Sequence, residues 1–100
     1  MPRTVQFAYR GASFEWDHVK AETNHAKHGV AFETACEAFF DPFRRVVDAG
    51  NHDEARDALI GYTESQILLT IVHLVRHEEI IRIISARRAS KEERSLYEQR

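Results

Sequence analysis

The sequence is poor in the features that mark secreted, disulfide-stabilised or membrane-bound proteins. Its single cysteine, Cys36, excludes an intramolecular disulfide bond and favours a reducing compartment. No apolar run approaches the length needed to cross a bilayer, and the first residues lack the hydrophobic core of a signal peptide. We therefore expect a cytoplasmic protein that does not associate with membranes.

A large excess of positive charge is also missing, because the formal net charge is −2. Such a chain is not covered in positive charge for indiscriminate DNA binding, although it can still carry a local basic site. Apolar residues make up 43% of the chain, which is ordinary for a folded protein, so disorder is not indicated.

Several common catalytic and binding motifs are absent from the sequence. It has no glycine-rich phosphate loop and no Gly-x-Ser-x-Gly of a serine hydrolase. Four of the six histidines occur in two pairs, His25 with His28 and His73 with His77. Neither pair has the spacing of a zinc site, and no cysteine or acidic pair completes one. We therefore expect no metal ion and no other cofactor.

Hydrophobic periodicity predicts one α+β domain over residues 1–100. Asp17 is a candidate N-cap for a first helix that ends before Gly29, and a second helix is expected from Phe32 to Phe40. A strand is expected at 43–47, at a sheet edge, followed by a loop at 49–57. Three further strands, at 58–63, at 67–75 and from 80 onward, are expected to form an antiparallel meander. A capping box at Ser90 and Glu93 begins a C-terminal helix.

The predicted order is therefore two N-terminal helices, an antiparallel sheet of three to four strands, and a C-terminal helix. Residues 1–13 alternate weakly in hydrophobicity, and two alternatives remain for them: an extra edge strand or an ordered tail.

The most informative stretch runs from Ile80 to Arg88, where β-branched residues predict a central strand that ends in arginines. Arg82 interrupts the isoleucines, and Ser85, Arg87 and Arg88 follow them. Guanidinium groups match phosphate oxygens in a two-pronged geometry, so phosphate is the expected ligand of this cluster.

A second basic side chain is expected to approach Arg82 from the preceding strand, in either of two registers. A three-residue loop pairs Arg82 with Leu74 and makes Arg76 its diagonal neighbour. A two-residue loop instead makes Arg82 diagonal to His73. The sequence does not decide between these registers.

Regular alternation along this strand places Arg82 and Arg88 on one face and Ser85 and Arg87 on the other, unless a bulge re-aims the strand end. The simplest competing interpretation is structural: Arg82 pairs with an acidic side chain from a helix, such as Glu33 or Glu37.

A series of sequence blocks carries a family resemblance. Between about residue 14 and residue 98 the chain contains, in order, Phe14-Glu15-Trp16-Asp17, Asn24-x-x-Lys27-His28-Gly29-Val30-x-Phe32, Ala38-Phe39-x-Asp41-Pro42, Arg56-x-x-x-Ile60-Gly61, Ile81-Arg82-Ile83-Ile84-Ser85-Ala86-Arg87-Arg88-Ala89 and Glu93-Arg94-x-x-Tyr97. This pattern resembles the BrnT family, toxins of bacterial type II toxin–antitoxin systems. Two departures are Ala31, where a serine or threonine is common, and the missing hairpin glycine near Ser65.

The resemblance implies a RelE-like fold and a metal-independent ribonuclease that inhibits translation. It also implies neutralisation by a BrnA-type antitoxin with a ribbon-helix-helix part, in a heterotetramer that contacts operator DNA through the antitoxin. An alternative is a catalytically weak module with the toxin fold, which acts mainly in antitoxin binding and operon autoregulation.

The catalytic candidates are Lys27, His28, Arg76, Arg82 and Arg87. The arginines would stabilise charge on the phosphorane, His28 would transfer protons, and Lys27 would bind phosphate. Two further residues, Arg88 and Tyr97, are expected to bind RNA. This hypothesis expects the guanidinium groups to be unpaired by acids; arginines already neutralised by carboxylates would favour a purely structural role.

Overall fold

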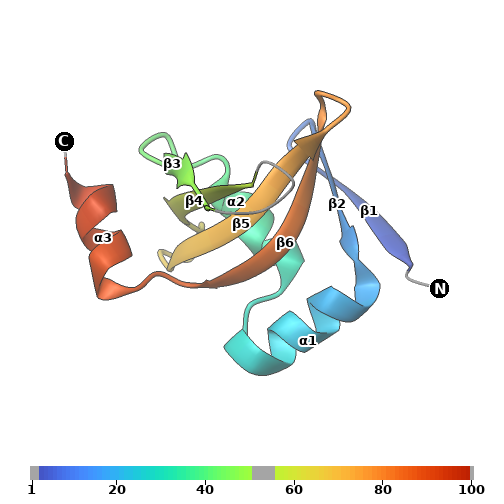
Figure 1. Cartoon of the computed structure of the whole chain (residues 1–100), viewed down its shortest axis with the longest axis horizontal. Helices are drawn as coiled ribbons and strands as arrows, with labels where there is room; N and C mark the ends of the chain where they lie inside the picture. The colour runs from blue at the N-terminus through green and yellow to red at the C-terminus, as the bar shows by residue number, and fades with distance from the viewer. Residues whose placement is uncertain (1–2, 51–55, 100) are drawn as a thin grey trace.

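The computed structural model describes residues 3–50 and 56–99, which form a sheet flanked by helices (Figure 1). In chain order the elements are β1 Thr4–Tyr9, β2 Ala12–Asp17, α1 His18–His28, α2 Phe32–Ala38, β3 Arg45–Asp48, β4 Asp57–Tyr62, β5 Leu68–Arg76, β6 Ile80–Arg88 and α3 Lys91–Glu98. Within the described ranges, no helix is long and apolar enough to span a bilayer.

The sheet has six strands in the order β1-β2-β6-β5-β4-β3 and is mixed rather than antiparallel. Strands β2 and β6 run parallel, with Ser13 opposite Ile80 and Glu15 opposite Arg82, whereas the other neighbours are antiparallel. The predicted fold, in which two helices lead into an antiparallel sheet of three to four strands, is therefore wrong. A strand hairpin precedes the helices and joins the sheet.

The turn of this first hairpin explains why the hairpin could not be predicted from the sequence. Arg10 and Gly11 both have positive φ angles, 51° and 84°, as the central residues of a tight hairpin turn do. Asparagine or aspartate is the usual partner of glycine at such a turn, and arginine gives no comparable signal. Residues 4–9 consequently form an edge strand, one of the two alternatives left open for residues 1–13.

Local signals at the helix ends are confirmed. The Asp17 side chain accepts a hydrogen bond from the backbone N–H of Lys20, and Gly29 adopts the left-handed conformation that ends α1. The capping box at Ser90 and Glu93 begins α3. By contrast, Ala31 provides no side-chain cap to α2, which ends at Ala38, before the predicted Phe40.

The β4–β5–β6 meander is also confirmed, and β3 lies at the sheet edge as predicted. The predicted loop at 49–57 lies partly outside the described residues, since 51–55 are not described. Its last residue, Asp57, begins β4.

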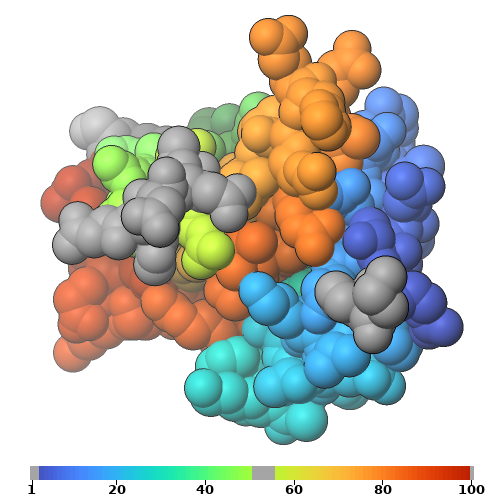
Figure 2. All heavy atoms as spheres, turned by 45° about the vertical axis from the view of Figure 1, so that its right-hand side comes forward, coloured from blue at the N-terminus to red at the C-terminus, as the bar shows by residue number. Residues whose placement is uncertain are grey.

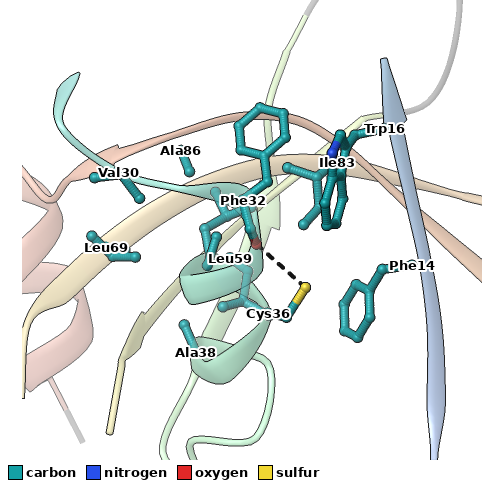
Figure 3. Close-up of a cluster of buried hydrophobic side chains, with 12 residues drawn as sticks. Phe14, Trp16, Val30, Phe32, Cys36, Ala38, Leu59, Leu69, Ile83 and Ala86 are labelled. Carbon is teal, nitrogen blue, oxygen red and sulfur yellow. Dashed lines mark hydrogen bonds between the residues drawn. The ribbon is translucent and has the colours of Figure 1, made fainter. Parts of the chain in front are cut away.

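The main core fills the space between α2 and one face of the sheet (Figure 3). Phe14 and Trp16 of β2 contribute large buried rings, and Trp16 packs edge-on against Phe32 at 5.7 Å between ring centroids. A second buried cluster forms on the opposite face, where α3 places Tyr97 against Ile60 and Leu68. Helices therefore cover both faces of the sheet, but α3 covers only one end of its face (Figure 1).

Cys36 is a core residue rather than a nucleophile. Its thiol is fully buried and donates a hydrogen bond to the carbonyl of Phe32 at 3.4 Å (Figure 3). Burial raises the pKa of the Cys36 thiol to about 12, so the reactive thiolate is suppressed at neutral pH.

Candidate nucleic-acid interface

The β5–β6 hairpin has the register of a three-residue loop. Arg76 lies opposite Ile80, and Arg82 lies opposite Leu74, so the two arginines are diagonal neighbours. The alternative register, which brought His73 beside Arg82, is not observed. His73 is instead buried against Phe39, and burial lowers its pKa.

A bulge in β6 changes which arginines share a face. His73 pairs with Ile83, whereas Val72 pairs with Ser85, so Ile84 is an extra residue in the ladder. Directly opposite residues of two strands point to the same side of the sheet. Ser85 therefore points to the same side of the sheet as Val72, and Arg87 points to the same side as its β5 partner, Thr70.

The β5 partners of Arg82, Ser85 and Arg87 are Leu74, Val72 and Thr70. These partners occupy every second position of β5, so all of them point to one side of the sheet. Arg76 lies on the same side. We call this side, which carries Arg76, Arg82, Ser85 and Arg87 and faces away from α2, the outer face. The prediction that Arg82 and Arg88 share one face of the sheet is wrong, because the bulge changes which side each residue after Ile84 points to.

Two of the outer-face arginines share one carboxylate. Glu15 Oε2 accepts hydrogen bonds from Nη1 of Arg82 at 2.8 Å and from Nη1 of Arg76 at 3.0 Å. Glu15 is buried, with 6% of its surface exposed, while the Arg76 side chain is 46% exposed and that of Arg82 22%. The acidic partner of Arg82 is thus Glu15, not the expected helix residue Glu33 or Glu37.

The third arginine is held by α3. Arg87 donates two hydrogen bonds to Glu93, at 2.7 and 2.8 Å, and the same carboxylate accepts a bond from the hydroxyl of Thr70. Hydrogen bonds from Arg87 lower the pKa of Glu93 to about 2, and the same contact raises the pKa of Arg87. This is a charge-assisted, two-pronged pair.

The expectation that these guanidinium groups are unpaired is therefore wrong. Each of the three arginines contacts a carboxylate, and the three positive charges face two negative ones, Glu15 and Glu93. The cluster keeps a net positive charge. Arg76 and Arg82 each use one N–H group on Glu15, out of the five that a guanidinium carries.

Helix α1 places its last turn beside the bulge. Lys27 and His28 line a groove of about 280 Å³ together with Lys20, Ile84 and Ser85. Lys27 is exposed and His28 is half-buried. No carboxylate lines this groove in the described ranges 3–50 and 56–99, so its charge is positive.

Asn24 fixes α1 against β6 where β2 no longer pairs with it. Its side chain accepts a hydrogen bond from the backbone N–H of Ala86 and donates to the carbonyls of Ala86 and Val30. The amide thus replaces the missing neighbouring strand at the strand edge. This contact sets the position of Lys27 and His28 relative to Ser85.

The two remaining predicted residues lie elsewhere. Arg88 is exposed and points to the face opposite Arg87. Tyr97 is only 8% exposed, packs on Tyr62 and donates a hydrogen bond to Asp41 at 2.7 Å, which leaves little of its ring for base stacking. The fold therefore places Arg76, Arg82 and Arg87 along the outer face, and Lys27 and His28 in a groove that reaches Ser85 of that face. Arg88 and Tyr97 are not part of either arrangement.

Sequence reasoning missed the two carboxylates that organise this site, although one left a signal. Glu15 stands between two aromatic residues, Phe14 and Trp16, in an extended segment. A carboxylate in such an apolar segment is rarely buried unless a basic side chain pairs with it. Glu93 was recognised only as a cap. Among the described residues there is no group of three potential metal ligands of the histidine, cysteine or carboxylate type.

Comparison with known proteins identifies the chain. A family model described as "Ribonuclease toxin, BrnT, of type II toxin-antitoxin system" matches residues 16–93. The 1.1 Å crystal structure of the Brucella abortus ribonuclease toxin BrnT is similar to this chain, with a TM-score of 0.55 and 28% identity, over 76% of this chain and 94% of that one. No curated protein matches the sequence.

The fold and the family match define a ribonuclease toxin of a type II toxin–antitoxin system. More narrowly, the chain belongs to the BrnT family. The resemblance seen in the sequence blocks is thereby confirmed.

Proposed function

We propose that this chain is a metal-independent endoribonuclease that cleaves RNA in the cytoplasm and thereby inhibits translation. The observation that carries the proposal is the shared outer face. The bulge at Ile84 places Arg82, Ser85 and Arg87 on one side, next to a basic groove from α1. RNA presents a phosphate at every nucleotide, and such a surface suits its backbone.

Two of the three chemical requirements of RNA cleavage have a candidate on this surface, and the third, a proton for the leaving 5′-oxygen, would come from water. The 2′-hydroxyl must lose a proton, and His28 is the candidate base because imidazole changes charge near neutral pH. Negative charge grows on the phosphorane oxygens, where Arg76, Arg82 and Arg87 would act. Lys27 would hold the substrate phosphate at the groove.

The ion pairs of the arginines are compatible with this role. A carboxylate that fixes a guanidinium in place reduces the entropy lost when a phosphate binds. Arg76 and Arg87 remain 46% and 43% exposed in their pairs, so a ligand can reach both side chains. Glu15 and Glu93 would act as positioning residues for these arginines, because their carboxylates hold the guanidinium groups in place.

The partner we propose is a BrnA-type antitoxin with a ribbon-helix-helix part. The family is defined by type II toxin–antitoxin systems, in which a protein antitoxin neutralises the toxin. We propose a heterotetramer, with operator DNA contacted through the antitoxin. Co-expression of the two chains, followed by measurement of the mass of the complex in solution, would test this composition; a one-to-one heterodimer would contradict it.

The nuclease proposal is tested with three variants, and the folding of each is measured before its activity because Arg87→Gln also breaks the ion pair with Glu93. Lys27→Ala and His28→Ala change side chains at the surface of α1, and Arg87→Gln removes one charge of the outer face. Each should remain folded and lose most RNA cleavage and growth arrest, because losing one stabilising contact typically costs roughly a hundredfold in rate. Arg88→Ala, on the opposite face, is the matched control and should keep activity. Full activity in all three variants would reject the site.

A second candidate function is favoured by the ion pairs themselves. If Glu15 and Glu93 neutralise the arginines, the chain would be a catalytically weak module for antitoxin binding and operon autoregulation. This function predicts tight antitoxin binding, no RNA cleavage by the purified chain and no growth arrest without antitoxin. RNA cleavage that depends on His28 would reject it.

A further inference from the structure

A hollow of about 350 Å³ lies on the outer face beside the arginine pair, where β1, β2 and β6 meet. Five of its lining residues point to this face: Gln6, Ala8, Ser13, Glu15 and Ile80. Gln6 lies directly opposite Glu15 across β1 and β2, and Ser13 lies opposite Ile80 across β2 and β6. In Figure 2 the blue N-terminal strands and the orange β5–β6 hairpin are neighbours on the surface.

The lining of the hollow combines polar groups with an apolar wall. The Gln6 amide offers both donors and an acceptor, Ser13 offers a hydroxyl, and the carboxylate of Glu15 can only accept. Ile80 and Ala8 provide apolar surface. Unstacked RNA bases are recognised by hydrogen bonds to their edges and by contact with their faces, and this lining provides both.

The hollow is continuous with the proposed phosphate site through Glu15. This residue lines the hollow and also binds Arg76 and Arg82. A nucleotide whose base enters the hollow would therefore have its phosphate near the two guanidinium groups. From Ile80 to Arg87 the strand spans roughly 23 Å, enough for a few nucleotides of extended single-stranded RNA.

We propose that this hollow is a base-binding subsite that prefers a base with an exocyclic amino group, adenine above all. Glutamine forms paired hydrogen bonds with adenine N6 and N7, and Glu15 can accept from an amino group. Uracil presents carbonyl oxygens instead, which the carboxylate repels. The subsite rests on the proposed RNA-binding function and deepens it by naming the preferred base.

Gln6 lies outside the part of the chain that matches the BrnT family, which begins at residue 16. Strand β1 therefore adds a wall to the outer face that the family match does not include. We infer that base preference in this chain is set by β1, whereas phosphate binding is set by the matched strands.

The test measures binding of the full chain to short oligonucleotides of 2′-O-methyl adenosine or 2′-O-methyl uridine, which resist cleavage. Fluorescence anisotropy should show tighter binding to the adenosine oligonucleotide. Gln6→Ala should weaken that binding about three- to tenfold, the effect of losing hydrogen bonds to one side chain, and leave uridine binding nearly unchanged. Thr4→Ala, an exposed residue of the same face of β1 that does not line the hollow, is the matched control and should bind like the parent chain.

Equal binding of both oligonucleotides, no binding of either, or equal weakening of both by Gln6→Ala would overturn the subsite. Cleavage of unmodified RNA by the parent chain separates this result from the proposed function. A chain that binds adenosine through Gln6 but cleaves no RNA supports the subsite and rejects the nuclease. A chain that cleaves RNA with the same base preference with or without Gln6 rejects the subsite alone.

Discussion

Glu93 binds Arg87 through both carboxylate oxygens, at 2.7 and 2.8 Å, and so ties the first turn of α3 to the end of β6. The same carboxylate accepts the backbone N–H of Ser90 in the capping box. One side chain therefore begins a helix and positions an arginine of the outer face. This double role makes the pair a sensitive test of how charge supports the fold.

Stability should fall in acid because of Glu93. Its pKa is lowered from 4.5 to about 2 in the folded chain, chiefly by Arg87, so its contribution is fully present above about pH 4.5 and disappears as the pH falls towards 2. Urea unfolding at pH 7, 5 and 3 should show a smaller loss on acidification for Glu93→Gln than for the parent chain. Glu92→Gln, an exposed neighbour in the same turn, is the control and should follow the parent. Parallel pH curves for Glu93→Gln and the parent would contradict the prediction.

Replacing Glu15 by glutamine should destabilise the chain. The substitution leaves Arg82, 22% exposed, without a charged partner, and breaking a buried pair in this way typically costs about 3 kcal/mol. The free energy of unfolding, measured in urea, should fall by about that amount. Glu22→Gln, on the exposed surface of α1, should change it little. An unchanged free energy would show that the Glu15 cluster is dispensable for the fold.

Asn24→Ala should loosen α1 from β6. The variant removes three hydrogen bonds to the backbone of Ala86 and Val30, and it leaves buried polar groups unpaired at a cost of about 3 kcal/mol. Hydrogen exchange of the Ala86 amide should become faster in the variant than in the parent chain. Thr23→Ala, one position earlier and exposed, serves as the control. Slow exchange at Ala86 in Asn24→Ala would mean that α1 is held by other contacts.

Tyr97→Phe should lower stability without changing RNA cleavage. The ring stays in its buried cluster, while the hydroxyl and its 2.7 Å hydrogen bond to Asp41 are removed. The free energy of unfolding should fall by about 1 kcal/mol. Thermal unfolding and RNA cleavage should be measured on the same preparation. A folded variant with greatly reduced cleavage would instead assign Tyr97 to RNA binding.

Elements set by local chemistry could be predicted from the sequence. The caps at Asp17, Gly29 and Ser90 depend on side chains within a few residues of one another, and each is found in the structure. The parallel pairing of β2 with β6 depends on contacts between distant segments, and no local pattern indicates it. The strand-first order of the fold was missed for this reason.

The candidate site was predicted in its composition but not in its arrangement. The arginines after Ile80 stand out in an apolar strand, and their association with the end of α1 followed from the family resemblance. The bulge at Ile84 and the pairing of Arg82 with Glu15 could not be predicted, because both depend on how distant strands meet. Alternation alone assigned Arg87 and Arg88 to the wrong sides.

The bulge in β6 has a consequence for how this strand tolerates change. Two arginines stand in tandem at its end, so a slip of one position would exchange Arg87 for Arg88 without removing a guanidinium from the outer face. The exchange would, however, separate that guanidinium from Glu93 and bring Arg87 into the place of Ala86, which is fully buried in the main core. Insertions or deletions in this short stretch would thus preserve the charge of the outer face but bury a guanidinium, so the core, and not the arginine pair, fixes the position of the bulge.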